Sequence, residues 1–89
     1  IIFMNINDLI AIVKKKLISE IKIEKIDIED KSYLHEKHSS HQKGKYHLKI
    51  IIGSHELKNL TKIEGSKKIY KVLNEEMKEY IHSLQILIS

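Results

Sequence analysis

The chain contains no cysteine, no proline and no tryptophan, and only three of its 89 residues are glycine. Without cysteine there is no disulfide bond, and the chain alone cannot hold an iron–sulfur cluster or a cysteine-type zinc site, so such metal chemistry needs sulfur from a partner. The sequence also lacks the run of roughly 18 apolar residues that a membrane-spanning helix requires. These absences favour a soluble intracellular protein, cytoplasmic or mitochondrial, that has no membrane contact and is held together by apolar packing alone.

Histidine, by contrast, is plentiful, with six residues in the chain. Five lie between His35 and His55, and the sixth, His82, opens an apolar run near the C-terminus. Imidazole is a common metal ligand, so His82 and the histidine-rich segment are candidate ligand sources. The alternative to ligation is that the histidine-rich segment is a solvated polar loop and that His82 is hydrogen-bonded and inert. A catalytic zinc site built from the loop histidines alone is not supported, because the sequence supplies neither a general base nor a pocket for it.

The first half of the chain predicts a helix, a strand and a long loop. Apolar residues across Ile6–Ile21 recur at intervals of three and four, as in an amphipathic helix, and Asn5 is suited to cap it. Alternation then predicts a short strand at Ile26–Glu29, with a late start or a bulge near Glu24. Asp30–Lys45 is polar, and its length predicts a functional or disordered loop.

The second half predicts two strands around a long helix. Tyr46–Ile52 alternates cleanly, which puts its even-numbered residues on the core face and His47 on the opposite face, at the surface or supporting a metal ligand. Thr61 and Glu64 have the spacing of a capping box, and a helical stripe continues to Tyr80. Gly65 weakens a helix by about 1 kcal/mol relative to Ala, so Ser66 is an alternative start.

Ile81–Ile88 predicts the last strand, in which His82, Leu84, Ile86 and Ile88 share one face. His55 follows a turn and is expected to be exposed. The resulting order of helix, strand, strand, helix and strand predicts an α+β fold with two helices packed on one face of a small three-stranded sheet. We expect a single domain over residues 1–89, with residues 1–5 disordered or introduced by cloning.

Four segments of the sequence resemble the BolA-like proteins in both residues and spacing. The first leads into the family's variable metal-binding loop, the second resembles its Ser-His-Phe-x-Val strand, the third its long helix and the fourth its Ile/Val-His-Ala-Leu strand. These segments are Asp30–His38, Tyr46–Ile52, Lys67–Met77 and Ile81–Ile86. Two departures are Gly65-Ser66-Lys67 in place of the family's Arg-His-Arg, and Leu48 in place of its Phe.

The resemblance implies a fold similar to the class II KH domain, with a mixed sheet, and a function without catalysis. In the family, a BolA-like protein and a monothiol glutaredoxin with glutathione share a [2Fe-2S] cluster used in iron–sulfur cluster assembly and trafficking. Carried over, the ligands from this chain would be His82 and a loop histidine, His38, with His35 and His41 as alternates. The chain would be monomeric alone and heterodimeric with its partner.

Nucleic-acid binding is the competing interpretation. Sixteen basic residues face 12 acidic ones, a net charge of +4 that favours phosphate, although the two signs are interspersed as on any solvated surface. Some BolA-like proteins are described as transcriptional regulators, and the KH-like fold makes DNA contact conceivable. The candidate contacts are Lys58, Lys62, Lys67 and Lys68. We expect no enzymatic activity, because the sequence has neither a nucleophile elbow nor a glycine-rich phosphate loop.

Overall fold

The structure is a computed structural model that describes residues 4–32 and 45–89. In chain order its elements are α1 (Ile6–Glu20), β1 (Lys25–Asp30), β2 (Tyr46–Gly53), α2 (His55–Lys58), α3 (Lys62–Val72), α4 (Asn74–Glu79) and β3 (Ile81–Ile88). The loop predicted at Asp30–Lys45 lies mostly outside the described residues. Within them, no helix is long and apolar enough to cross a membrane.

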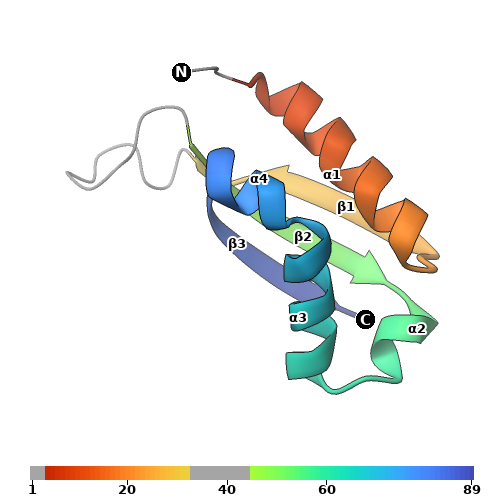
Figure 1. Cartoon of the computed structure of the whole chain (residues 1–89). Helices are drawn as coiled ribbons and strands as arrows, with labels where there is room; N and C mark the ends of the chain where they lie inside the picture. The colour runs from red at the N-terminus through yellow and green to blue at the C-terminus, as the bar shows by residue number, and fades with distance from the viewer. Residues whose placement is uncertain (1–3, 33–44) are drawn as a thin grey trace.

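The strands form one mixed sheet in the order β1-β2-β3, with β1 antiparallel and β3 parallel to β2. The helices lie together on one face of this sheet (Figure 1). The predicted α+β class, the mixed sheet and the placement of the helices on one face are therefore confirmed. The sheet has two distinct ends: the His82 end, where β1 finishes and β2 and β3 begin, and the Ser54 end, where β2 and β3 finish.

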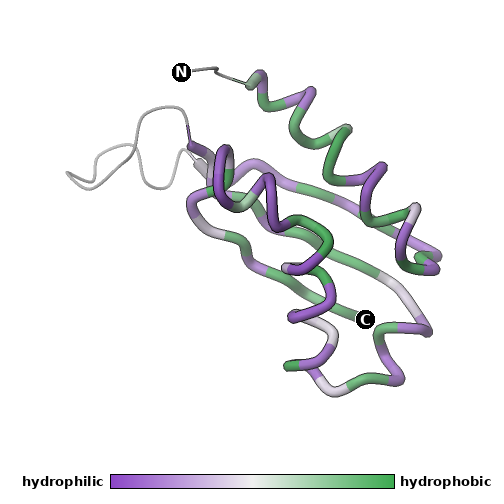
Figure 2. Tube along the Cα trace, in the orientation of Figure 1, coloured by the Kyte–Doolittle hydropathy of each residue, from purple (hydrophilic) through white to green (hydrophobic). Residues whose placement is uncertain are grey.

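Helix α1 forms as its sequence pattern predicts. The side chain of Asn5 accepts a hydrogen bond from the N–H of Asn7 and caps the helix, and Leu9, Val13 and Leu17 are fully buried. Figure 2 shows apolar and polar stretches alternating along α1, as expected of a helix that presents one side to the sheet. Just before the helix, the carbonyl of Met4 accepts a hydrogen bond from the Tyr46 hydroxyl, and residues 1–3 lie outside the described part.

Strand β2 forms the centre of the core. Leu48, Ile50 and Ile52 are at most 2% exposed, and their side chains face the helices. β1 begins at Lys25, which confirms the late start of the strand that was predicted as the alternative to a bulge near Glu24. Ile26 and Ile28 pair with Ile52 and Ile50 on the same face. The alternation predicted for Tyr46–Ile52 is confirmed, and it fixes which side of the sheet is buried.

The predicted long second helix is wrong in two respects. It is divided at Leu73, whose φ of −96° and ψ of 18° separate α3 from α4. The short helix α2, capped by Ser54, was not predicted. Periodicity did not reveal the division because Leu73 stays fully buried and keeps the apolar stripe in phase.

The start of the helix is the capping box, as predicted, and Ser66 is not its N-cap. Thr61 accepts a hydrogen bond from the Glu64 N–H, and the Glu64 carboxylate accepts one from the Thr61 N–H. Gly65 is buried, and a Cβ atom added there would lie 3.0 Å from Cδ1 of Ile88. The glycine therefore allows α3 to lie close to β3.

Candidate metal-ligating site and basic surface

Strand β3 contains a bulge at its start. Tyr46 pairs with Ile81 and His47 pairs with Ser83, so β3 has one additional residue, His82, between consecutive pairs with β2. A bulge of this kind interrupts the alternation of side chains between the two faces of a sheet. From Leu84 onward the pairing is regular, and Leu84, Ile86 and Ile88 lie opposite the core residues of β2.

The bulge corrects the predicted orientation of His82. Its ring packs against His47, with ring centroids 5.0 Å apart and planes inclined by 58°, on the face of the sheet that the helices do not cover. His82 therefore does not share a face with Leu84, Ile86 and Ile88. The residue is exposed, so its imidazole can contact another molecule.

His47 faces away from the core side of β2, as predicted, but it is not a surface residue. Only 5% of it is exposed. Its Nδ1 lies 2.6 Å from Oγ of Ser83, and its backbone N–H donates to Oγ of Ser32 over 3.0 Å. That His47 supports a metal ligand stays a prediction, whereas the prediction that it is a surface residue is wrong.

The candidate loop ligands His35, His38 and His41 lie outside the described residues. The two ends of the segment that carries them are described, and both lie at the His82 end of the sheet. β1 finishes with Asp30 opposite Leu48, and β2 begins with Tyr46 opposite Ile81, next to His82. The topology therefore brings both flanks of the histidine-rich segment to the strand end that carries His82.

In the two described ranges, no three histidine, aspartate or glutamate residues gather closely enough to hold a metal ion. A metal centre at His82 would thus need ligands from the 33–44 segment or from another molecule. His55 is not part of this site: its side chain is 90% exposed at the Ser54 end, and its Nδ1 lies 3.0 Å from a carboxylate oxygen of Glu24. The predicted exposure of His55 is confirmed.

The four candidate nucleic-acid contacts lie on α2 and α3. Lys58, Lys62 and Lys67 are exposed and have no ion-pair partner among the residues described. Lys68 differs, because its Nζ donates to Glu56 over 2.6 Å, and this hydrogen bond lowers the pKa of the Glu56 carboxyl. Three of the four are therefore available to an anionic partner.

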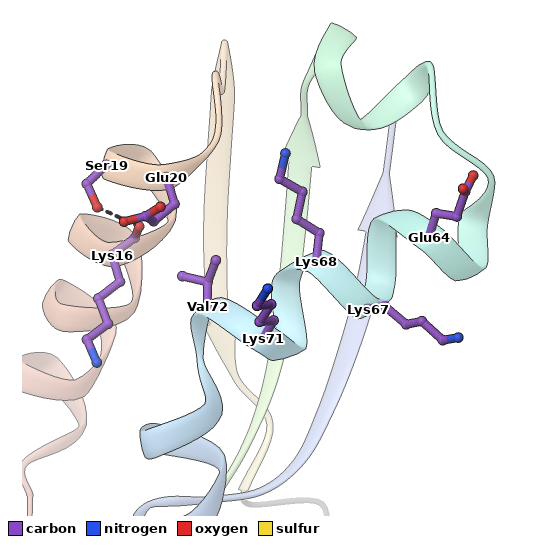
Figure 3. Close-up of a pocket in the computed structure, with 8 residues that line it drawn as sticks. All are labelled: Lys16, Ser19, Glu20, Glu64, Lys67, Lys68, Lys71 and Val72. Atoms are coloured by element: carbon purple, nitrogen blue, oxygen red, sulfur yellow. Dashed lines mark hydrogen bonds between the residues drawn. The ribbon is translucent and has the colours of Figure 1, made fainter.

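A groove of about 820 Å³ separates α3 from α1. Figure 3 shows its lysines, including Lys16 and Lys71, which the sequence did not single out. Their side chains do not converge: Lys68 extends toward α2, and Lys67 points away from α1. Lys16 is paired with Glu76 over 2.7 Å. Because Glu20 and Glu64 also line it, the groove has mixed charge and is not a concentrated phosphate site.

Comparison with known proteins now identifies the family. A family model described as BolA-like protein matches residues 17–89. The chain belongs to the BolA-like family. It is 33% identical over 75 residues to a protein of Haemophilus influenzae named DNA-binding transcriptional regulator BolA, a match that covers 84% of this chain and 70% of that protein. It is 40% identical over 74 residues to an uncharacterised protein of Buchnera aphidicola, covering 83% of this chain and 68% of the relative.

Solved structures agree on the BolA-like fold. The BolA domain of SufE1 from Arabidopsis thaliana superposes with a TM-score of 0.77 at 24% identity, covering 97% of this chain and 93% of that domain. BolA1 from the same plant gives 0.74 at 24% identity, covering 89% and 87%. The resemblance noted from four sequence segments is therefore confirmed for both family and fold.

One feature of this BolA-like site was missed in the sequence, although a signal for it is present. The apolar residues of β3 that face the helices are Ile81, Leu84 and Ile86, so the first interval is three and the second is two. A strand without a bulge would give intervals of two throughout. The interval of three marks the additional residue, and that residue is His82.

Proposed function

We propose that this BolA-like chain takes part in iron–sulfur cluster assembly by sharing a [2Fe-2S] cluster with a monothiol glutaredoxin and its glutathione. His82 would supply one ligand, and His38 the second, with His35 and His41 as alternates. One observation carries the proposal: the imidazole of His82 is exposed on the sheet face that the helices do not cover. Both ends of the 33–44 segment lie at the same end of the sheet.

The residues present fit a shared cluster. Imidazole can replace thiolate on iron, and such a replacement raises the reduction potential of the cluster. This chain has no cysteine, so the remaining sulfur ligands would come from the partner and from glutathione. The tasks of the chain itself are to hold the His82 ring at the surface and to bring the loop histidines to the same end of the sheet. We expect a monomer without the partner and a heterodimer with it.

The test is to add the chain to a cluster-loaded monothiol glutaredoxin and to record visible absorption and circular dichroism. Wild-type chain should change both spectra, and His82→Ala should abolish the change. His55→Ala is the matched control, because it removes an exposed histidine at the opposite end of the sheet. If His82→Ala gives the wild-type spectrum, His82 is not a ligand.

Single substitutions in the 33–44 segment then assign the second ligand. His38→Ala should reduce the spectral change, whereas His35→Ala and His41→Ala should leave it near the wild-type value. A loss confined to one of the alternates would reassign the ligand without affecting the role of His82. If all three single variants behave like wild type, the second ligand is not one fixed loop histidine.

DNA binding is the second candidate function. The Haemophilus influenzae relative bears that name, and Lys58, Lys62 and Lys67 are exposed and available to phosphate. Affinity for duplex DNA should fall steeply with salt, since phosphate contacts release counterions. Replacing these three lysines by glutamine should weaken binding and flatten the salt dependence, while glutamine at Lys14 and Lys15 of α1 serves as the control. An absence of DNA binding by wild-type chain at low salt would exclude this function.

A further inference from the structure

The two outer strands of the sheet differ in how their free edges are protected. Four of the six residues of β1 are charged, whereas β3 has no lysine, aspartate or glutamate. Proteins use charged side chains and bulges to stop a free edge from pairing with another strand. β1 has such charges along its length, and β3 has a bulge only at its start. The remainder of β3, residues 84–88, is therefore an unprotected edge, which we call the β3 edge.

Backbone groups of the β3 edge point away from the sheet. The N–H of Ser89 donates to the carbonyl of Ile52 over 2.8 Å, so the N–H of residue 89 is directed toward β2. Successive residues of a strand direct their backbone groups to opposite sides. The N–H and carbonyl groups of Leu84, Ile86 and Ile88 are therefore directed to the free side. In residues 4–32 and 45–89, the sheet has no further strand on that side.

Helix α3 runs beside the β3 edge. The hydroxyl of Tyr70 donates to the carbonyl of Leu84 over 3.2 Å, so the side of α3 that carries Tyr70 lies over the edge. Nearer the start of α3, a Cβ atom at Gly65 would lie 3.0 Å from Cδ1 of Ile88. α3 and β3 therefore run in opposite directions, and the helix borders the edge along its length.

The surface on both sides of the β3 edge is apolar and includes one cation. Ile63 and Lys67 lie on the same side of α3 as Tyr70, because residues three and four apart are neighbours on a helix. Ile63 is 69% exposed, Tyr70 is 41% exposed, and Leu87, on the sheet face that the helices do not cover, is 44% exposed. Lys67 points away from α1 (Figure 3) and has no ion-pair partner among the described residues.

We propose that the β3 edge binds an extended segment of a partner protein as an added strand, with an apolar, an acidic and an apolar side chain in turn facing α3. The outward backbone groups of the edge would hydrogen-bond the segment, as in other complexes formed by strand addition. The two apolar side chains would contact Tyr70 and Ile63, and the acidic one would pair with Lys67. Alternate residues of a strand lie about 7 Å apart and residues one helical turn apart about 5 Å, so the two rows of side chains can meet.

A second copy of this chain fits the β3 edge less well than an acidic segment. If two β3 edges paired about a two-fold axis, α3 of both copies would lie on the same face of the joined sheet. The side of α3 that carries Lys67 would then face its counterpart, and each copy has a net charge of +4. Like charges across an interface disfavour association, whereas a carboxylate opposite Lys67 favours it. Charge therefore favours the acidic segment.

The probe is a synthetic peptide with capped ends and the sequence Thr-Val-Thr-Glu-Thr-Val-Thr, which presents valine, glutamate and valine on one face. It is added to the whole chain without metal or protein partner, and amide hydrogen exchange is followed by NMR. Exchange at Ile86 and Ile88 should slow when the peptide is present. Exchange at Gln85 and Leu87 should stay unchanged, because these amides are directed toward β2. Such alternation along one strand is specific to an added strand.

Variants of exposed residues test the side-chain contacts. Lys67→Glu should weaken binding of the peptide about fivefold, as expected for an exposed ion pair, and should strengthen binding of a peptide with lysine in place of glutamate. Ile63→Ser should also weaken binding. Ile18→Ser is the matched control, because it removes an isoleucine that is 55% exposed on α1. A peptide with N-methylated backbone amides should not bind, because it cannot donate hydrogen bonds to the edge.

The proposal is overturned if the peptide slows no amide of residues 84–88, or if N-methylation leaves its affinity unchanged. It also fails if Ile18→Ser weakens binding as much as Ile63→Ser does. Alternating protection that is present without peptide and declines on dilution would make a second copy the occupant. If duplex DNA slowed the same alternate amides, the edge would not be specific for an extended segment. A failure of cluster sharing leaves these results unaffected, because none of the measurements involves metal.

Discussion

The two ends of the sheet use similar polar residues for different purposes. At the Ser54 end, Oγ of Ser54 donates to the carbonyl of Lys22 and accepts from the N–H of Leu57, so it connects the segment after α1 with α2. At the His82 end, Oγ of Ser83 bonds the side chain of His47, beside an exposed histidine. One serine satisfies backbone groups, and the other bonds a side chain.

The difference indicates which end can carry function. Backbone groups inside a fold must be hydrogen-bonded wherever they occur, so the Ser54 contacts are explained by folding alone. The bulge of β3 places Ile81 in the core, where it is 1% exposed, and leaves the neighbouring His82 exposed. The His82 end therefore combines burial of the core with an exposed histidine, and the predictions below separate the two ends.

The largest effect on stability is expected beneath the His82 end, where α4 leads into β3. Glu76 is 5% exposed, one carboxylate oxygen pairs with Lys16 over 2.7 Å, and the other has no hydrogen-bond partner among the described residues. Lys16→Ala should destabilise the fold more than Ser54→Ala does, because it leaves a buried carboxylate without its countercharge. Glu76→Met should stay within about 1 kcal/mol of wild type, since it also removes the unpartnered oxygen. Urea unfolding measures the loss of stability in each variant. Equal losses in Lys16→Ala and Glu76→Met would contradict the prediction.

The next largest difference in stability is expected between alanine substitutions of the serines at the two ends. Ser54→Ala should cost about 2 kcal/mol, because it leaves the buried Leu57 N–H and the partly buried Lys22 carbonyl without their partner. Ser83→Ala should cost about 1 kcal/mol or less, because Ser83 is exposed and one hydrogen bond is lost. Urea unfolding gives both values. A larger loss in Ser83→Ala would mean that the contact between Ser83 and His47 supports the whole fold.

Most of the fold could be predicted from the sequence, because α1 and all three strands have strong local periodicity. The division at Leu73 could not, since a buried residue with non-helical dihedral angles leaves the apolar stripe in phase. Helix α2 is a single turn, too short for any period to be visible.

The candidate site was predicted in part. Residue type and family resemblance single out His82, but its orientation depends on pairing between β2 and β3, which are far apart in sequence. For the same reason the burial of His47 was not predicted, since alternation says which face a residue occupies and not what covers that face. The loop histidines stay predictions, because they lie outside the described residues.

A smaller effect is expected where α3 meets the Ser54 end of β3. Ala has about 1 kcal/mol better helix propensity than Gly, but a Cβ at Gly65 would lie 3.0 Å from Cδ1 of Ile88. Gly65→Ala should therefore be nearly neutral in wild type, and stabilising by about 1 kcal/mol in an Ile88→Val background that lacks this methyl group. Urea unfolding of wild type, the two single variants and the double variant gives the coupling free energy between positions 65 and 88. Equal effects in both backgrounds would show that Ile88 moves aside at no cost.

The smallest effect concerns pH, and it again contrasts the two ends. At the Ser54 end, a hydrogen bond from the His55 backbone N–H is the main cause that lowers the pKa of Glu24 below its ordinary value of 4.5. At the His82 end, the side chain of Lys31 lowers the pKa of Glu29. Since both folded-state pKa values are depressed, each carboxylate contributes stability above the ordinary pKa, and this contribution is lost as pH falls through the folded-state value.

Removing the partner side chain should therefore change the pH dependence of stability at the His82 end only. Lys31→Gln should reduce the loss of stability on acidification, as Glu29→Gln does, because the cause of the Glu29 shift is a side chain. His55→Ala should retain most of the Glu24 contribution, because the substituted residue still donates its backbone N–H to the carboxylate over 2.8 Å, while Glu24→Gln removes it. Urea unfolding on both sides of the ordinary glutamate pKa measures these differences. If His55→Ala and Glu24→Gln had the same pH dependence, the imidazole would be the group that holds Glu24, and the Ser54 end would also depend on a histidine side chain.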